Sequence, residues 1–166
     1  RIFCNTNLAA AGGVVTALIL CQLLYKKVDL TFVLNGALGG LVSITAEPLA
    51  PTFISAVLIG GIGGALVVLT VPLLDKLKID DVVGAIPVHL VCGIWGTLAV
   101  PLTNSDAKFS IQLIGILSIG AFVLISSFIL WYAVKAILGV RLSDEEEKDG
   151  ADKTEIGLSS YPEFTK

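Results

Sequence analysis

Residues 82–102 of the chain read VVGAIPVHLVCGIWGTLAVPL, an apolar run that contains no Lys, Arg, Asp or Glu. A helix rises about 1.5 Å per residue, so about 20 apolar residues cross the ~30 Å hydrocarbon core of a bilayer. A surface helix of a water-soluble domain would instead carry charged residues along its exposed face. The run therefore predicts a membrane-spanning helix.

Four further apolar runs flank this one and are separated by short polar connections. In lipid, a spanning segment must satisfy its own backbone hydrogen bonds, so each run is expected to be a helix. We therefore expect an all-α membrane protein with five transmembrane helices within residues 1–142. The second helix is short, and we expect it to be tilted or partly interfacial. The five runs are about 2–25, 30–46, 53–74, 82–102 and 109–138.

The composition leads to the same class of protein. Hydrophobic residues make up 55% of the chain and charged residues 15%, whereas a soluble domain carries roughly 25% charge. Eight acidic and three basic residues give segment 143–166 a net charge of −5, while six acidic and eight basic residues give the rest +2. We expect a membrane body followed by an acidic tail in water.

No nucleophile–base pair, phosphate-binding loop or basic nucleic-acid patch is evident, so neither an enzyme nor a nucleic-acid binder is predicted.

The basic residues predict the orientation, because Lys and Arg concentrate in cytoplasmic loops. Only Arg1 and Lys108 lie on the opposite side of the predicted membrane. The N-terminal end is therefore expected outside and the acidic tail in the cytoplasm. The residues that follow the first, third and fifth runs are Lys26, Lys27, Lys76, Lys78, Lys135 and Arg141.

Glycines occur in pairs spaced for close helix packing. Gly36 and Gly40 form a GxxxG pair in the second run, and Gly60 and Gly64 form another in the third. In lipid, close approach of helix backbones replaces the hydrophobic drive of water. We favour packing over a direct pore-lining role for these glycines.

His89 is the only histidine and lies near the middle of the fourth run. A polar side chain at that depth is costly and is often functional. Its imidazole can line a path for a small polar molecule, or it can bond to a backbone carbonyl and only hold helices together. The residues alone leave both readings open. Pro87 and Gly84 predict a broken entry to this helix, and Asp80 and Asp81 are interpreted as its caps.

A metal site at His89 and Cys92 is disfavoured. The two residues share one helix face, but zinc or copper needs three or four protein ligands, and the sequence has no second histidine. The three cysteines form no paired pattern and are interpreted as small packing residues. No cofactor and no metal is predicted.

Several stretches together resemble the last five helices of the ammonium transporter (Amt/Mep/Rh) family. The end of the chain resembles the bacterial branch of that family, through 139–143, the glutamates that follow, and 160–164. The stretches in the membrane runs are Asn5-Thr6-Asn7, 34–46 and 88–96.

The resemblance implies a fold of eleven helices per subunit, with two inverted five-helix repeats and a long final helix. Subunits of this family form homotrimers, and each subunit conducts ammonium or ammonia through a hydrophobic pore past two facing histidines. His89 matches the second histidine of that pair. The first histidine and the aromatic gate would lie upstream, and a start without Met agrees with a missing upstream part. Residues expected to pack near or line the pathway are Asn5, Asn7, Pro87, Val88 and Trp95.

The same resemblance implies a location and partners. We expect a multi-pass protein of the cell (inner) membrane, in contact with the lipid bilayer and with a PII-type nitrogen-signalling protein at its tail. An ammonium sensor with little transport and a structural subunit of a membrane complex are the alternatives. An enzyme using His89 would need further polar residues at the same depth.

Overall fold

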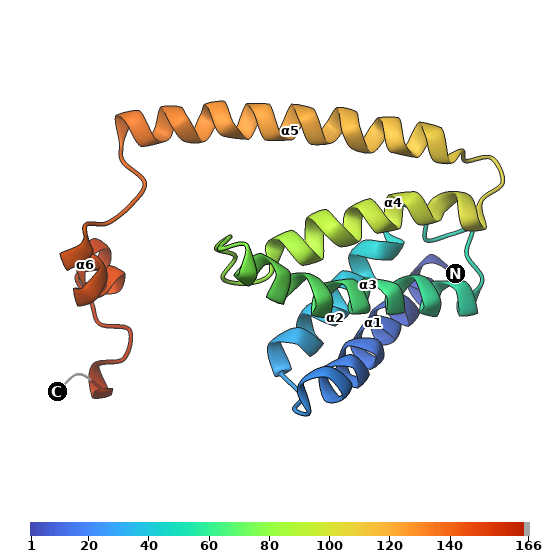
Figure 1. Ribbon diagram of the computed structural model, residues 1–166, viewed down its shortest axis with the longest axis horizontal. Coiled ribbons are helices and arrows are strands. Elements are labelled where there is room, and N and C mark those ends of the chain that lie inside the picture. Colours follow the sequence, from blue (N-terminus) through green and yellow to red (C-terminus); the bar gives the residue numbers. More distant parts are fainter. Residues whose placement is uncertain (165–166) are drawn as a thin grey trace. The chain divides into compact units, whose positions relative to one another are not determined.

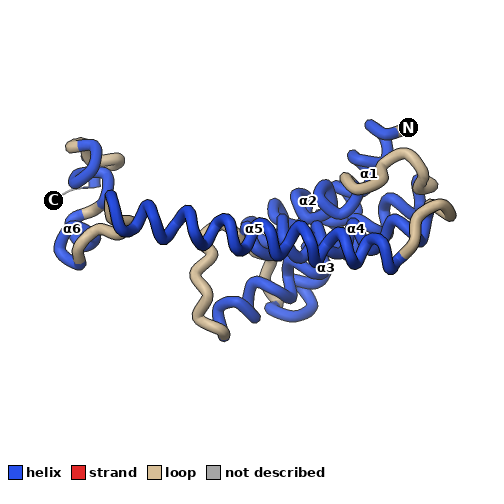
Figure 2. The backbone as a smooth tube through the Cα atoms, turned by 90° about the horizontal axis from the view of Figure 1, so that it is seen from above, coloured by secondary structure: helices blue, strands red, loops and turns tan. Residues whose placement is uncertain are grey.

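The computed structural model describes residues 1–164, and all regular elements within them are helical (Figure 2). The π-helical segment η1 (Ile86–Val91) leads directly into α4. Short helical turns follow in the tail: α6 (Asp144–Asp149), the π-helical η2 (Asp152–Ile156) and the 3-10 helical η3 (Pro162–Phe164). The long helices are α1 (Ile2–Tyr25), α2 (Leu30–Ile44), α3 (Phe53–Lys76), α4 (Cys92–Thr103) and α5 (Phe109–Ile137).

Four helical stretches of the described chain are long and apolar enough to cross a membrane. They are α1, α3, the continuous stretch Ile86–Thr103 formed by η1 and α4, and α5. The apolar helix α2 has 15 residues, which at about 1.5 Å per residue is shorter than the ~30 Å hydrocarbon core. The second predicted run is thus shorter than a membrane span requires, as its length in the sequence suggested. The chain is an all-α membrane protein.

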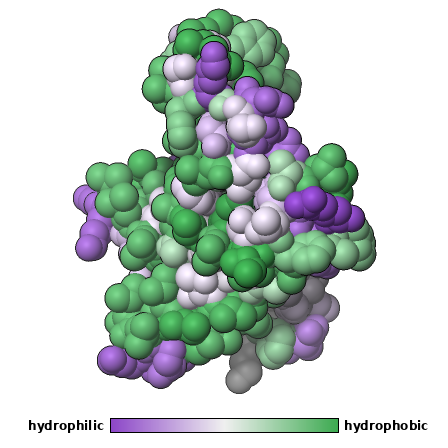
Figure 3. Space-filling view, turned by 90° about the vertical axis from the view of Figure 1, so that its right-hand side faces the viewer, coloured by the Kyte–Doolittle hydropathy of each residue, from purple (hydrophilic) through white to green (hydrophobic). Residues whose placement is uncertain are grey.

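The chain divides into two compact units, residues 1–119 and residues 120 onward. In the first unit, α1, α2, α3 and α4 pack together around small buried residues (Figure 1). Many large apolar side chains of these helices are exposed. Much of the face of the molecule in Figure 3 is hydrophobic. α5 has no buried residue among those described. Lipid tails are as apolar as these side chains, so such a surface is stable in a bilayer and not in water.

The glycine pairs lie where helix backbones meet. A Cβ atom on Gly60 would overlap the carbonyl group of Ala9, and one on Gly64 would overlap the carbonyl group of Gly13. The pair on α2 faces the same two carbonyl oxygens of α1. The packing role predicted for these glycines is confirmed, because no side chain has room at any of the four positions. They are Gly36, Gly40, Gly60 and Gly64.

Candidate functional site

His89 lies in η1, a short π-helical turn at the entry to α4. Such turns are rare in proteins and occur frequently at functional sites. Pro87 lies in its first turn and is buried, and it lacks the N–H that a continuous helix would require. The imidazole of His89 is exposed, together with the side chain of Leu90. Within residues 1–164, the His89 imidazole makes no hydrogen bond to a carbonyl oxygen or a carboxylate.

Asp81 caps the start of this segment, as predicted. Its two carboxylate oxygens accept hydrogen bonds from the backbone N–H groups of Ala85 and Ile86, each at 2.8 Å. A negative charge at this end also complements the helix dipole. Gly84 adopts a φ of +77°, a left-handed conformation that turns the chain from the loop into the helix.

Asn35 on α2 joins this loop to the helix bundle. Its side chain is 9% exposed, and its Nδ2 donates a hydrogen bond to the Val83 carbonyl oxygen at 2.9 Å. A Cβ atom on Gly84 would come within 2.7 Å of the same nitrogen. The partner of the Asn35 amide lies 48 residues away in the sequence. No local pattern in the sequence signals this contact.

The opposite side of η1 and α4 packs on α3. Val88 and Cys92 form a buried cluster with Val67, and the Cys92 thiol donates to the Gly63 carbonyl oxygen at 3.4 Å. Trp95 is half-buried, and its indole N–H donates to the carbonyl oxygen of Ile59 at 3.0 Å. The structure therefore places Pro87, Val88 and Trp95 on the elements that carry His89. Val88 and Trp95 hold these elements against α3, and Pro87 is buried.

The two asparagines at the start of α1 have different surroundings. Asn5 is fully buried, and its Nδ2 donates to the carbonyl oxygens of Pro48 and Pro51 at 2.8 and 2.9 Å. Its Oδ1 atom has no hydrogen-bond partner. Asn7 is exposed and donates to the carbonyl oxygen of Phe3 in its own helix. Asn5 thus fastens the loop between α2 and α3, and neither amide bonds to the His89 segment.

Glu47 is a second anchor of the same loop. Its carboxylate accepts hydrogen bonds from the backbone N–H groups of Leu49 and Ala50 and from the Asn104 amide at the end of α4. The backbone amides of Ala50 and Leu49 are the main reason that the pKa of Glu47 is lowered from its ordinary value. The hydrogen-bond partners of Glu47 depend on how this loop folds back toward the end of α4.

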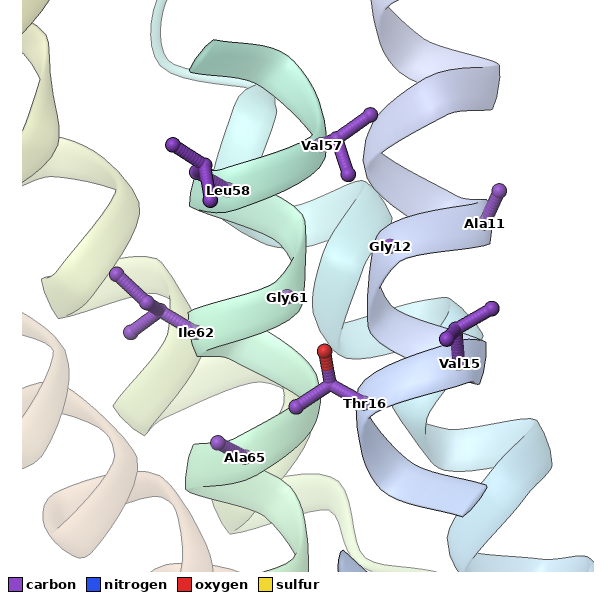
Figure 4. A pocket seen from close by; sticks show the side chains of 9 residues that line it. All are labelled: Ala11, Gly12, Val15, Thr16, Val57, Leu58, Gly61, Ile62 and Ala65. Atoms are coloured by element: carbon purple, nitrogen blue, oxygen red, sulfur yellow. The ribbon is translucent and has the colours of Figure 1, made fainter. Parts of the chain in front are cut away.

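Two depressions in the surface border these helices. A cleft of about 240 Å³ is lined in part by Asn35, Asp29 and Asp81. An apolar groove of about 440 Å³ lies between α1 and α3 (Figure 4). In that groove the hydroxyl of Thr16 lies beside Gly61. Among the described residues, no three His, Cys, Asp or Glu side chains gather as a metal site would require.

A bundle of apolar helices, packed through glycines and containing a broken helix with a histidine at its exposed face, is typical of a multi-pass membrane transport protein. The family profile described as "Ammonium Transporter Family" matches residues 1–161. The chain belongs to this family, which consists of transporters rather than enzymes.

Individual relatives agree with this assignment. The putative ammonium transporter sll1017 of Synechocystis sp. is 43% identical over 157 residues, covering 92% of the chain and 36% of the relative. Ammonium transporter Amt2 of Archaeoglobus fulgidus is 37% identical over 180 residues, covering 96% of the chain and 38% of the relative.

Two solved structures share the fold. The structure of a protein described as "Sensor Amt Protein" matches with a TM-score of 0.86 and 32% identity, covering 93% of the chain and 41% of that protein. The structure of Saccharomyces cerevisiae Mep2 matches with a TM-score of 0.78 and 29% identity, covering 94% of the chain and 40% of that protein. The chain thus spans about 40% of the length of these proteins.

Proposed function

We propose that the protein carrying this chain moves ammonium or ammonia across the cell membrane along a path bordered by His89. The observation that carries the proposal is the exposed imidazole on a broken, apolar helix of a chain that belongs to the ammonium transporter family. The names of the relatives support the substrate.

The chemistry of imidazole suits this role. A neutral imidazole offers one hydrogen-bond donor and one acceptor, so it can receive a small polar molecule from one side and pass it to the other. A net charge at the bilayer centre costs at least ~2.5 kcal/mol on insertion scales. A neutral relay therefore favours the passage of ammonia with a separately moved proton over the passage of the intact cation. A second histidine facing His89, contributed by a part of the subunit outside these residues, would complete the relay.

The same proposal includes an assembly and an orientation. The subunit forms a homotrimer in the inner membrane, with the start of this chain outside and the tail in the cytoplasm, as the distribution of Lys and Arg indicates. In the tail, Ser143 and Glu146 form a reciprocal cap, and the Asp152 carboxylate accepts from the backbone N–H of Ser160. These acidic turns offer a surface for a PII-type signalling protein.

A sensor with little transport is a second candidate, because one structural relative of 32% identity is described as "Sensor Amt Protein". The two functions differ in flux. A transporter gives ammonium-dependent current or uptake in proteoliposomes, whereas a sensor changes signalling in cells without such a flux.

The test is a chimera in which residues 1–166 replace the matching segment of the Synechocystis relative. It is expressed in cells that lack their own ammonium transporters, and uptake is measured. We expect the chimera to restore uptake and His89→Leu to abolish it, because leucine fills the space and offers no hydrogen bond. Leu124→Ala on the exposed α5 surface is the matched control and should transport normally. Uptake at the parental rate by His89→Leu would show that His89 is not part of the transport pathway.

A further inference from the structure

We propose that Asn35 is a positioning residue that sets where His89 faces, through its hydrogen bond to the Val83 carbonyl oxygen. The inference rests on the proposed role of His89 in the pathway. It concerns a residue on a different helix, 54 positions earlier in the chain, whose amide bonds to the loop before η1 rather than to the imidazole.

The loop before η1 is otherwise held mainly by bonds within itself. The Asp81 carboxylate bonds to Ala85 and Ile86, and the backbone N–H of Gly84 donates to the Asp81 carbonyl oxygen. These bonds shape the turn but do not attach it to another helix. Among the side-chain hydrogen bonds of residues 1–164, the one from Asn35 is the only one that joins residues 80–85 to another helix.

The side chains of this loop add little further attachment. Val82 is 89% exposed and Val83 is 68% exposed, so neither is packed against the bundle. Asn35 itself is buried beside Gly36, where α2 approaches α1 closely, and this fixes the place of its amide. The loop is therefore attached to a rigid helix at the Val83 carbonyl, one residue before the left-handed turn at Gly84.

The place of that attachment decides the rotation of η1. Successive residues of a helix are rotated by about 100°, so a shift of one residue in the start of the segment would turn His89 to another face. A π-helical turn contains one residue more than an α-helical turn. Contacts with neighbouring segments must therefore hold η1 in register. Contacts of Val88, Cys92 and Trp95 with α3 anchor the register from the C-terminal side of His89 and from the buried face. The Asn35–Val83 bond anchors it from the N-terminal side.

This role requires the Nδ2–H donor of Asn35 rather than the volume of its side chain. Asn35→Asp keeps the shape but places an acceptor against the Val83 carbonyl oxygen. Asn35→Ala removes the group altogether. Gln22, an exposed amide on α1, gives the matched controls Gln22→Glu and Gln22→Ala.

His89 is the only histidine, so isotope labelling of histidine gives NMR signals from this imidazole alone. These signals report the surroundings of the His89 side chain. The 166-residue chain, purified with a tag free of histidine and placed in lipid bilayers, is examined by nitrogen NMR. We expect both Asn35 variants to shift or split the imidazole resonance, with helix content by circular dichroism unchanged. Both Gln22 variants should match the parent. An unaltered imidazole resonance in the two Asn35 variants would overturn the inference.

Transport in the chimera with the Synechocystis relative separates this inference from the proposed function. Misplacing a reacting group by about 1 Å can cost about 100-fold in rate, so we expect the Asn35 variants to lose at least tenfold in maximal uptake. If the variants shift the resonance while the parental chimera carries no flux, the transport proposal fails and the positioning of His89 by Asn35 stands. If the variants lose uptake with an unshifted resonance, Asn35 does not act through His89.

Discussion

Replacing Gly60 by alanine should separate α1 from α3, and the structure gives the size of the effect. A Cβ atom on Gly60 would lie 2.5 Å from the Cα atom of Ala9, whereas ordinary van der Waals contacts begin at 3.4 Å. The carbonyl oxygen of Ala9 lies nearer still. The two backbones must therefore move apart by at least about 0.9 Å at this crossing, the difference between those two distances. The obstructing atoms belong to the backbone, so no side chain can turn away to make room.

The energetic cost follows from the type of contact. Inserting a methyl group into a tightly packed interface costs typically about 1–3 kcal/mol. Helix association in lipid depends on this close packing because there is no hydrophobic drive between helices. Alanine favours the helical state by about 1 kcal/mol over glycine, and this offsets only part of the loss.

The assay is the unfolding of the purified chain in detergent micelles with increasing SDS, followed by circular dichroism. Relative to Gly120→Ala, Gly60→Ala should lower the free energy of unfolding by about 1–3 kcal/mol, because both substitutions gain the same helix propensity. Gly120→Ala is the matched control, since nothing lies within 4 Å of a Cβ atom at that position of α5. The control should be neutral or stabilising by up to about 1 kcal/mol. Equal effects of the two substitutions would refute the reasoning that α1 and α3 pack backbone to backbone at Gly60.

Three further outcomes are expected. The pKa of Glu47 is lowered by the amides of Ala50 and Leu49, so its contribution to stability is present at neutral pH and is lost as the pH falls through its folded pKa. Acidification below about pH 4.5 should therefore destabilise the parent more than Glu47→Gln in the same unfolding assay; an identical pH profile would contradict this. Deleting Ser143 onward in the chimera should spare membrane assembly but weaken control of transport by nitrogen status, and loss of folded protein would indicate a structural role instead. A reporter fused to the C-terminus should be active in the cytoplasm, and periplasmic activity would reverse the predicted orientation.

The sequence by itself determined the class and family of this protein. Long runs without charge can be stable only in lipid, and in lipid they can only be helices, so the membrane character follows from composition and spacing. The GxxxG pairs are equally local signals, because two glycines four positions apart always share one helix face. Pro87 and Gly84 indicated a broken entry to the His89 helix, because each disturbs the backbone at its own position.

Only the tertiary structure decided which polar residues serve which purpose. Asn5 and Asn7 are the same residue type two positions apart, but a helix rotates by about 200° over that distance, so one is buried against the loop and the other is exposed. Asn35 bonds to a carbonyl oxygen 48 residues away, and Glu47 bonds to an amide 57 residues away. A hydrogen bond requires two groups to meet within about 3 Å, and in a helical bundle the meeting of distant residues is decided by how the helices pack rather than by the residues beside them in the chain.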